Sequence, residues 1–334
     1  MDKNNTVHID HNIIDFIHKN PESRLDKTLK EKYQVIFTDE NLSEIERCGN
    51  QSDDYAEILS RLCPLYLEIC FNDDNIPNDE AMLREYPVAG SLKIRRERVP
   101  SIDEIKTKIM QPLLKILGGR PGEGAEKIFE EQRVAMHQIA HYVGNDISEK
   151  EIKSSDVAEL ARLEVEKLKE KYDEDINTRM DEAKKLIGAD HTYDGLKSLR
   201  AEIKVEPKIL NNIKGGKVIQ KIWEKAKDSD YVTKNGMTLE RLFGIEKGFH
   251  NFDQELPIYY KAYVMYLMLN VIGFHQDEGI LKTNRFISAS SDSYHVANAI
   301  FADQLLSMDK KLCAKARAVY EYLGIGTQVI HLIK

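Results

Sequence analysis

The chain has 334 residues and a mass of 38.4 kDa, with 42% hydrophobic and 31% charged residues. This composition is that of a folded soluble protein, and it excludes fibrous, collagen-like and wholly disordered chains. The 48 Lys and Arg residues are outnumbered by 56 Asp and Glu residues, so no global positive field attracts nucleic acid or an anionic membrane. Any contact with a polyanion therefore requires a local basic patch.

The four cysteines, at positions 48, 63, 70 and 313, show neither CxxC spacing nor the density of a disulfide framework. The first twelve residues are polar and lack the basic and apolar regions of a secretory signal. We therefore expect reduced thiols and a cytoplasmic location.

The segment 256–274 holds 19 residues with one charge, Lys261, which meets the length of a membrane span. Lys261, Asn270 and several tyrosines require polar partners, and Pro257 suits the first turn of a helix. We therefore expect a deeply buried helix and no membrane partner.

The two ends of the chain share one pattern. At the N-terminal end the pattern predicts strands over 6–10 and 33–38, a helix over 12–18, and a second helix that begins near Thr38 or Asp39. At the C-terminal end it predicts helices over 292–301 and 310–323, and strands over 304–308 and 326–333. Such alternation is typical of an α/β unit.

Between these ends, from about residue 55 to 274, nearly every periodic segment is helical, including 125–143 and 156–187. The simplest arrangement is one discontinuous α/β domain, formed by residues 1–72 and 250–334, with an all-helical insertion over 73–249. We expect this insertion to select a substrate, a regulatory protein or a second copy of the chain.

Four carboxylates stand at the ends of the predicted α/β elements. Asp10 and Asp309 end strands, Glu44 lies one turn into a helix, and Asp292 is expected to open a helix. In an open α/β sheet such positions converge on one crevice at the carboxyl ends of the strands. Clustered carboxylates repel one another unless cations neutralise them, and Mg²⁺ or Mn²⁺ is the expected occupant. Metal-assisted phosphodiester hydrolysis is the chemistry that such a cluster supports.

The order of these motifs resembles the PIN-domain nuclease family. Asp10 with Asn12 corresponds to the family's Asp-x-Asn/Ser after the first strand, and Glu44 to its helical Glu. The family's Asp-x-x-His-h-A-x-A motif is matched by Asp292, His295 and Ala297. Its Thr/Ser-x-Asp strand end is matched by Ser307 and Asp309.

The resemblance covers about 50 residues at each end, and it implies a three-layer α/β/α domain with a mostly parallel sheet. It implies an endonuclease that uses Mg²⁺ or Mn²⁺ and prefers RNA to DNA, as toxin-like or defence ribonucleases do. The resemblance also implies that metal is bound by Asp10, Asp292 and Asp309. It implies that Glu44 binds metal or orients water. Asn12 and Ser307 would orient these carboxylates, and His295 would support the site.

Three alternatives stay open. Glu40 lies one helical turn before Glu44 and competes for its role. The substrate could be DNA, as in flap-processing nucleases. The chain could also be a non-catalytic interaction protein in which Asp292 and Asp309 only cap helices.

Residues 91–120 carry eight Lys and Arg residues against three acids, which makes this segment the leading candidate for contact with nucleic acid. The residues that we expect to bind phosphates are Lys93, Arg95, Arg96 and Arg98. A solvated face with local salt bridges is the competing interpretation.

Overall fold

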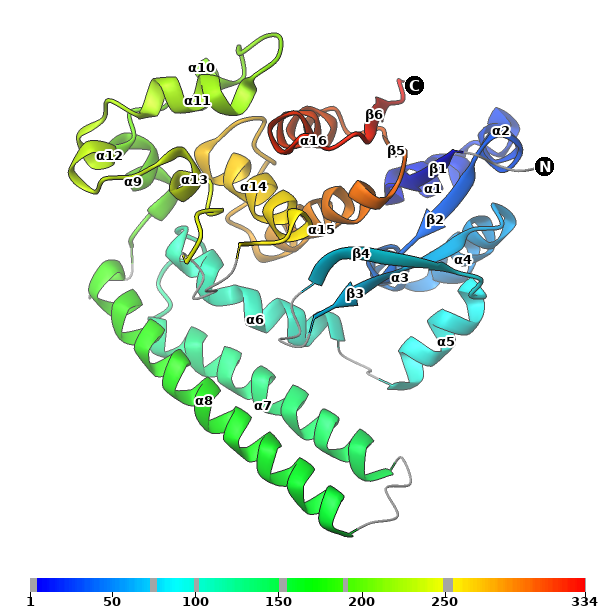
Figure 1. The fold of residues 1–334 in the computed structure, drawn as a ribbon, viewed down its shortest axis with the longest axis horizontal. Coiled ribbons are helices and arrows are strands. Elements are labelled where there is room, and N and C mark those ends of the chain that lie inside the picture. The colour runs from blue at the N-terminus through cyan, green and yellow to red at the C-terminus, as the bar shows by residue number, and fades with distance from the viewer. Residues whose placement is uncertain are drawn as a thin grey trace. The chain divides into compact units, whose positions relative to one another are not determined.

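A computed structural model describes residues 5–72, 77–98, 102–149, 155–188, 192–248 and 255–333. The described strands form one sheet in the order β4-β3-β2-β1-β5-β6 (Figure 1). Their bounds are β1 Thr6–Ile9, β2 Gln34–Phe37, β3 Leu65–Phe71, β4 Pro77–Arg84, β5 Gln304–Ser307 and β6 Gln328–His331. All neighbouring pairs are parallel except β3 with β4. The protein is therefore an α/β protein with a mostly parallel sheet, as the sequence predicts.

The two ends of the chain meet in the centre of this sheet. The strand β1 pairs with β2 on one side and with β5 on the other, with His8 opposite both Ile36 and Leu305. Parallel neighbours place their carboxyl ends at one edge of a sheet. The positions that follow β1 and β5 are therefore brought together although about 300 residues separate them.

The helices fill most of the remaining chain. In the first third of the chain they are α1 His11–Lys19, α2 Leu25–Lys32, α3 Asp39–Arg47, α4 Ser52–Arg61, α5 Val88–Arg98 and α6 Ile102–Ile116. The middle third contains α7 Ala125–Glu149, α8 Ser155–Ile187, α9 Gly195–Glu202, α10 Pro207–Leu210 and α11 Val218–Ala226. The last are α12 Asp230–Lys234, α13 Leu239–Leu242, α14 Ile258–Ile272, α15 Thr283–Asn298 and α16 Lys310–Leu323, and short 3-10 turns span 21–23, 49–51 and 299–301.

Helices cover both faces of the sheet, because successive strand residues face opposite sides. Leu306 belongs to a core that is shared with α1, α3 and α4, whereas Leu305 belongs to a second core that is shared with α14 and α16. Both leucines are buried, and burial of a leucine side chain contributes about 1.5–3 kcal/mol.

The predicted helical stretch from 55 to 274 is wrong at two places, because β3 and β4 lie within it. The apolar run of β3 has the length at which periodicity does not separate strand from helix. The strand β4 is a mostly exposed edge strand without an apolar face, and it is defined by its antiparallel pairing with β3.

The chain forms two compact units, whose boundaries differ from the predicted domain boundaries. One unit contains residues 1–98, 199–278 and 288–334, and the other contains 99–198 and 279–287. The sheet unit thus includes 77–98 and 199–248, which the sequence assigned to the insertion. These segments belong to it because β4 extends the sheet and because residues 203–245 contribute to the core beneath α14 and α16.

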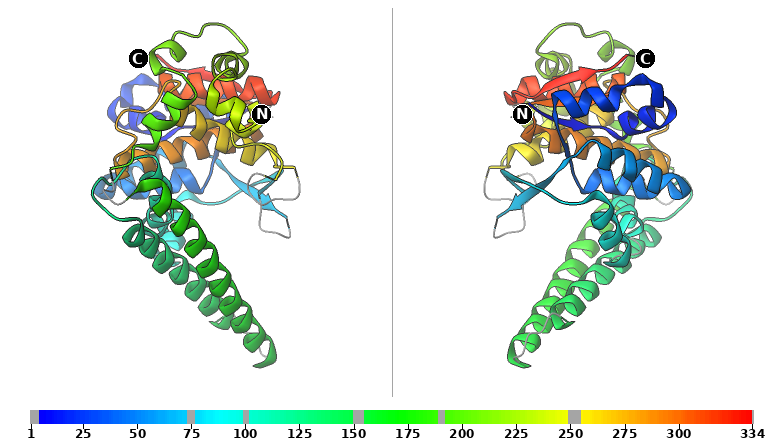
Figure 2. Two further views of the ribbon diagram at one scale, coloured as in Figure 1. Left: turned by 90° about the vertical axis from the view of Figure 1, so that its left-hand side faces the viewer. Right: turned by 90° about the vertical axis from the view of Figure 1, so that its right-hand side faces the viewer.

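The second unit is built on the long helices α7 and α8, which run side by side (Figure 2). Both helices occupy the segments predicted to be helical. Phe129 of α7 packs with Ile176 and Ala183 of α8 in a common apolar cluster.

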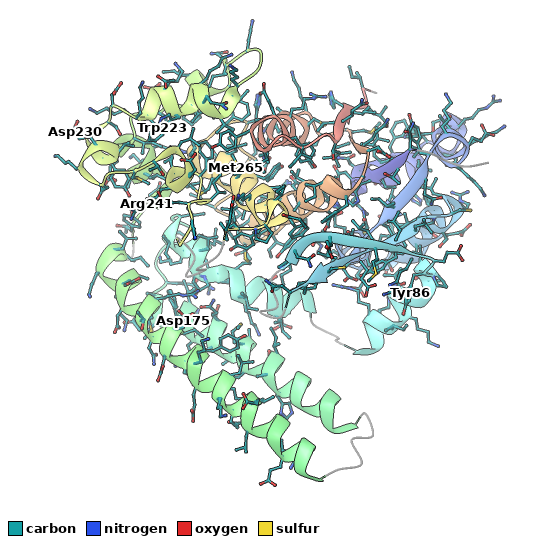
Figure 3. The ribbon with its side chains drawn as sticks, in the orientation of Figure 1. Tyr86, Asp175, Trp223, Asp230, Arg241 and Met265 are labelled. Atoms are coloured by element: carbon teal, nitrogen blue, oxygen red, sulfur yellow. The ribbon has the colours of Figure 1, made fainter. Side chains whose placement is uncertain are left out.

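The apolar segment 256–274 forms the buried helix α14, as predicted. Met265, Tyr266 and Leu269 are fully buried in the sheet unit, and Figure 3 labels Met265 there. Lys261 pairs with Glu255 at 2.6 Å. No helix in the described part of the chain is long and apolar enough to cross a membrane.

Candidate active site

Asp10 is held in one orientation by residues from two strand ends. It follows β1 and its side chain is buried. Ser307, the last residue of β5, donates its hydroxyl proton to Asp10 Oδ2 at 2.6 Å, and the Asn12 amide donates to the same oxygen. The Asn12 Oδ1 atom in turn accepts the backbone N–H of Met308 at 2.9 Å. Asn12 and Ser307 thus hold the Asp10 carboxylate in one orientation.

Glu44 of α3 forms an ion pair with His295 of α15. The distance from His295 Nε2 to Glu44 Oε2 is 2.6 Å, and His295 Nδ1 lies 2.9 Å from His8 Nε2. Burial opposes protonation of His295, but the Glu44 charge outweighs it and raises the pKa of His295 to about 9. Burial likewise opposes ionisation of Glu44, but His295 lowers its pKa to about 2. At neutral pH the pair is therefore an imidazolium and a carboxylate.

The protonated His295 uses both ring nitrogens as donors. Its Nδ1–H donates to His8 Nε2, so His8 is neutral and carries its proton on Nδ1. Burial, together with the charge of His295, lowers the pKa of His8 well below its usual value, in agreement with this assignment. His8, His295 and Glu44 thus form a hydrogen-bonded series, in which His295 carries one positive charge beside the carboxylates.

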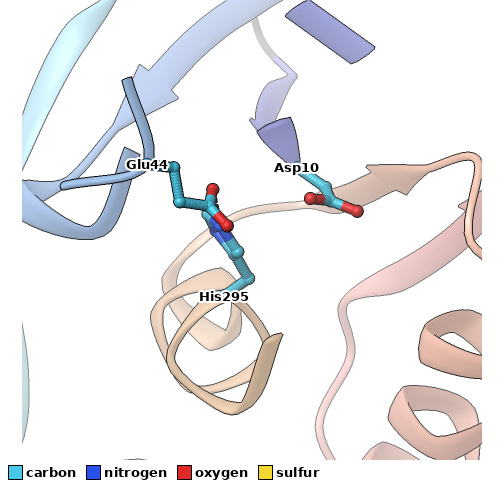
Figure 4. Close-up of side chains that lie close together, drawn as sticks. All are labelled: Asp10, Glu44 and His295. Carbon is cyan, nitrogen blue, oxygen red and sulfur yellow. Dashed lines mark hydrogen bonds and ion pairs between the residues drawn. The ribbon is translucent and has the colours of Figure 1, made fainter. Parts of the chain in front are cut away.

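Asp10, Glu44 and His295 lie close enough together to share a cation. One potential ligand atom from each lies within 4.8 Å of the others. Among the described residues, these three form the one such group of acidic, histidine or cysteine side chains. Figure 4 shows the Glu44 carboxylate next to His295 and the Asp10 carboxylate at the end of β1. Because a protonated imidazole is no ligand, His295 acts here as a counter-charge.

Asp292 lies in the middle of α15, so its prediction as a helix start is wrong. The helix begins at Thr283, nine residues earlier. The serines on either side of Asp292 have partners within the fold, since Ser291 donates to Glu40 Oε1 at 2.5 Å and Ser293 to the Ser290 carbonyl at 2.6 Å. Serine side chains that bond in this way are compatible with a helix interior.

The partly buried Asp292 carboxylate lies close enough to Asp10 for their charges to interact, although among the described residues its oxygens do not belong to the Asp10, Glu44 and His295 group. Burial raises its pKa well above the usual value, and the charge of Asp10 adds to this effect. Burial also raises the pKa of Asp10, against the opposing attraction of His295. The hydroxyl of Tyr266 donates to Asp292 Oδ2 at 3.3 Å. A carboxylate whose ionisation is opposed by burial and by a neighbouring carboxylate favours a bound proton or a cation.

The buried Lys315 and Asp277 adjoin this acidic pair and were not predicted. Lys315 Nζ lies 2.8 Å from Asp277 Oδ2, 2.7 Å from Asn270 Oδ1 and 4.5 Å from the centre of the Tyr266 ring. Burial lowers the pKa of Lys315, and the charge of Asp277 opposes this shift. One sequence signal existed, because the spacing of Leu312, Ala316 and Val319 places position 315 on the buried face of its helix.

Asp309 caps α16, while its charge faces the same region. Its Oδ1 atom accepts the backbone N–H groups of Lys311 at 2.6 Å and Leu312 at 3.0 Å. Its backbone N–H donates to Ser307 at 2.9 Å. Among the described residues its ligand atoms do not belong to the Asp10, Glu44 and His295 group.

The geometry places Glu44, and not Glu40, beside Asp10. Glu40 accepts a hydrogen bond from Ser291 and lies 3.4 Å from Arg47 Nη2. Arg47 is also 3.8 Å from Glu44 Oε1.

The arginines of the predicted basic patch have intramolecular partners. Arg95 Nε pairs with Glu46 of α3 at 2.6 Å, and Arg96 pairs with Asp53 of α4 at 3.2 Å. They therefore connect α5 to α3 and α4, as the competing interpretation expected. Lys93 is exposed. The side chain of Arg98 lies outside the described residues.

Comparison of the chain with protein-family models, with curated proteins and with solved structures finds no match.

Proposed function

We propose that the protein is a metal-dependent endonuclease that hydrolyses phosphodiester bonds of RNA on a PIN-like α/β/α domain. The observation that supports this proposal is the buried carboxylate of Asp10, which Ser307 and Asn12 fix after its strand, close to Glu44 and within reach of the charge of Asp292. This position is the crevice at the carboxyl ends of parallel strands, where α/β proteins bind their ligands. A purely structural role would not require a buried carboxylate with further carboxylates close to it.

The donor set fits Mg²⁺ or Mn²⁺. These cations prefer carboxylate oxygens and retain water ligands, and a divalent cation relieves the opposition that Asp292 meets to its ionisation from burial and from the charge of Asp10. Asp10 and Asp292 would hold the ion, with Glu44 and Asp309 next to them. When bound, the cation would polarise the phosphate and lower the pKa of water.

The residues of the chain divide the remaining tasks. Ser307 and Asn12 keep one oxygen of Asp10 in place, so the other can face the cation. Glu44, with a pKa of about 2, stays ionised at neutral pH and therefore provides charge and orientation and is a poor proton acceptor. In-line attack of water on phosphorus would leave a 5′-phosphate and a 3′-hydroxyl.

The test is a cleavage assay with labelled single-stranded RNA and DNA in Mn²⁺, Mg²⁺ or EDTA. The parent is compared with Asp292→Asn, which keeps the size of the side chain and an acceptor for Tyr266 but loses the charge. Asp54→Asn, on the exposed face of α4, is the matched control. We expect cleavage of RNA by the parent and the control, a loss of about a thousandfold in Asp292→Asn, and no cleavage in EDTA.

Three results decide against this proposal. Equal cleavage by the parent and Asp292→Asn would exclude the site. A preference for DNA under the same metal would replace RNA by DNA as the substrate. Failure of the parent to cut either polymer would favour a non-catalytic role.

A further inference from the structure

We propose that the groove between α10 and α11 binds the phosphate backbone of the single-stranded RNA that the acidic site cuts. This inference rests on the proposed function, and it replaces the arginines of α5 as the expected nucleic-acid contact. The groove has a volume of about 650 Å³. The residues that line it are Ile209, Asn212, Ile213, Lys214, Lys221, Glu224 and Lys225.

The charge of this region supports an anionic ligand. Residues 207–227 contain six lysines and one glutamate, in a chain whose net charge is −8. That glutamate, Glu224, pairs with Lys227 at 2.6 Å. Lys214 and Lys225 are exposed and have no acidic partner among the described residues. Unlike Arg95 and Arg96, they remain available for phosphates, which supply the sequence-independent part of binding to nucleic acids.

The backbone that carries the lysines is held by the core and by hydrogen bonds. The α11 residues Ile219 and Ile222 are fully buried, and the partly buried Trp223, labelled in Figure 3, packs against the same core. Before α11, the Lys217 backbone N–H donates to Glu321 Oε2 at 2.7 Å, and Lys221 Nζ donates to the Lys214 carbonyl at 2.7 Å. The backbone that carries the lysines therefore needs little ordering when a ligand binds.

A short series of contacts connects the groove with the acidic site. Asn211, next to the lining residue Asn212, accepts the backbone N–H of His275 at 2.6 Å. Two residues later, Asp277 contacts Lys315. A strand that passes over the loop 273–277 can thus reach both the groove and the acidic pair.

The nature of the lining favours a polynucleotide. Ile209 is 48% exposed, and with Ile213 it gives the floor of the groove an apolar surface between lysines. Single-stranded nucleic acids offer this combination, because their bases and sugars pack on apolar side chains while their phosphates contact cations.

The test measures binding without catalysis, by fluorescence anisotropy of a labelled single-stranded RNA in EDTA at several salt concentrations. Lys214→Gln/Lys225→Gln is compared with Lys30→Gln/Lys32→Gln, which removes two exposed lysines from α2. We expect the groove variant to lose about tenfold in affinity and about 1.4 in the slope of log K against log salt, for two lost phosphate contacts. The α2 variant should bind like the parent.

Equal losses of RNA affinity in the two variants, or no loss in the groove variant, would overturn the inference. The same holds if polyglutamate displaces the labelled RNA as well as unlabelled RNA does. Binding and cleavage fail separately. If the parent binds RNA through the groove but cuts nothing, the proposed function alone is refuted. If the parent cuts RNA and the groove variant binds RNA as tightly as the parent does, the inference alone is refuted.

Discussion

The Nε2 atom of His295 lies 2.6 Å from Oε2 of Glu44, so the Asp-x-x-His motif supplies a counter-charge to the carboxylate of another helix. His295 is fully buried, and its second nitrogen is bonded to His8. This ion pair explains how Glu44 remains ionised next to Asp10 without a bound metal ion.

Substitution of His295 by Gln should lower the free energy of unfolding by about 3 kcal/mol at pH 6, because it leaves Glu44 without its charged partner. His295 has a raised pKa of about 9, so its stabilisation is complete below about pH 6.5 and is lost as the pH rises through 9. Glu44 has a depressed pKa of about 2, so its stabilisation is lost only as the pH falls below about 4.5. Urea denaturation at pH 6 and pH 10 measures this, and an equal difference at both pH values would contradict it.

Asp292→Asn should stabilise the metal-free protein at pH 7–8. The substitution removes a partly buried carboxylate whose ionisation is opposed by burial and by the charge of Asp10, and each kcal/mol of relief raises Tm by about 2–4 °C. The sign follows from the raised pKa of Asp292, since the cost of its ionisation grows as the pH rises above the unfolded value. Mn²⁺ should raise Tm of the parent but not of the variant. Thermal melts in EDTA and in Mn²⁺ test both statements, with Asp54→Asn as control.

Ser307→Ala should weaken Mn²⁺ binding and cleavage by about 10- to 100-fold while the fold persists, because Asp10 loses one of its two orienting donors. Ser60→Ala, which removes a hydroxyl bonded to the Ala56 carbonyl, is the control. Calorimetric titration of Mn²⁺ measures the affinity. Unchanged affinity would mean that the orientation of Asp10 does not matter for the metal.

Lys315→Met should lower the free energy of unfolding by about 3 kcal/mol, because Asp277 loses its partner in a buried site. The double variant Lys315→Met/Asp277→Leu should recover much of this loss. A double-mutant cycle in urea gives the interaction energy. Additive effects of the two substitutions would contradict the pairing.

The α/β elements at both ends of the chain were predictable, since β1, α1, β5 and α16 carry clear apolar periodicity. The edge strand β4 was not, because its residues are mostly exposed and only its partner defines it. The start of α15 was misplaced because Asp292, with Ser291 before it, resembles a helix cap until the tertiary partner of Ser291 is known. Lys315 and Asp277 were missed because a buried ion pair between distant segments leaves no local signal beyond the apolar positions around the lysine.

The most direct measurement is the rate at which the parent, Asp10→Asn and Asp292→Asn cleave a 5′-labelled single-stranded RNA in Mn²⁺. The account predicts metal-dependent cleavage by the parent, and a loss of about a thousandfold in either variant, because each removes a carboxylate that carries the charge of the site. Cleavage at equal rates by all three proteins, or cleavage that survives EDTA, would contradict it.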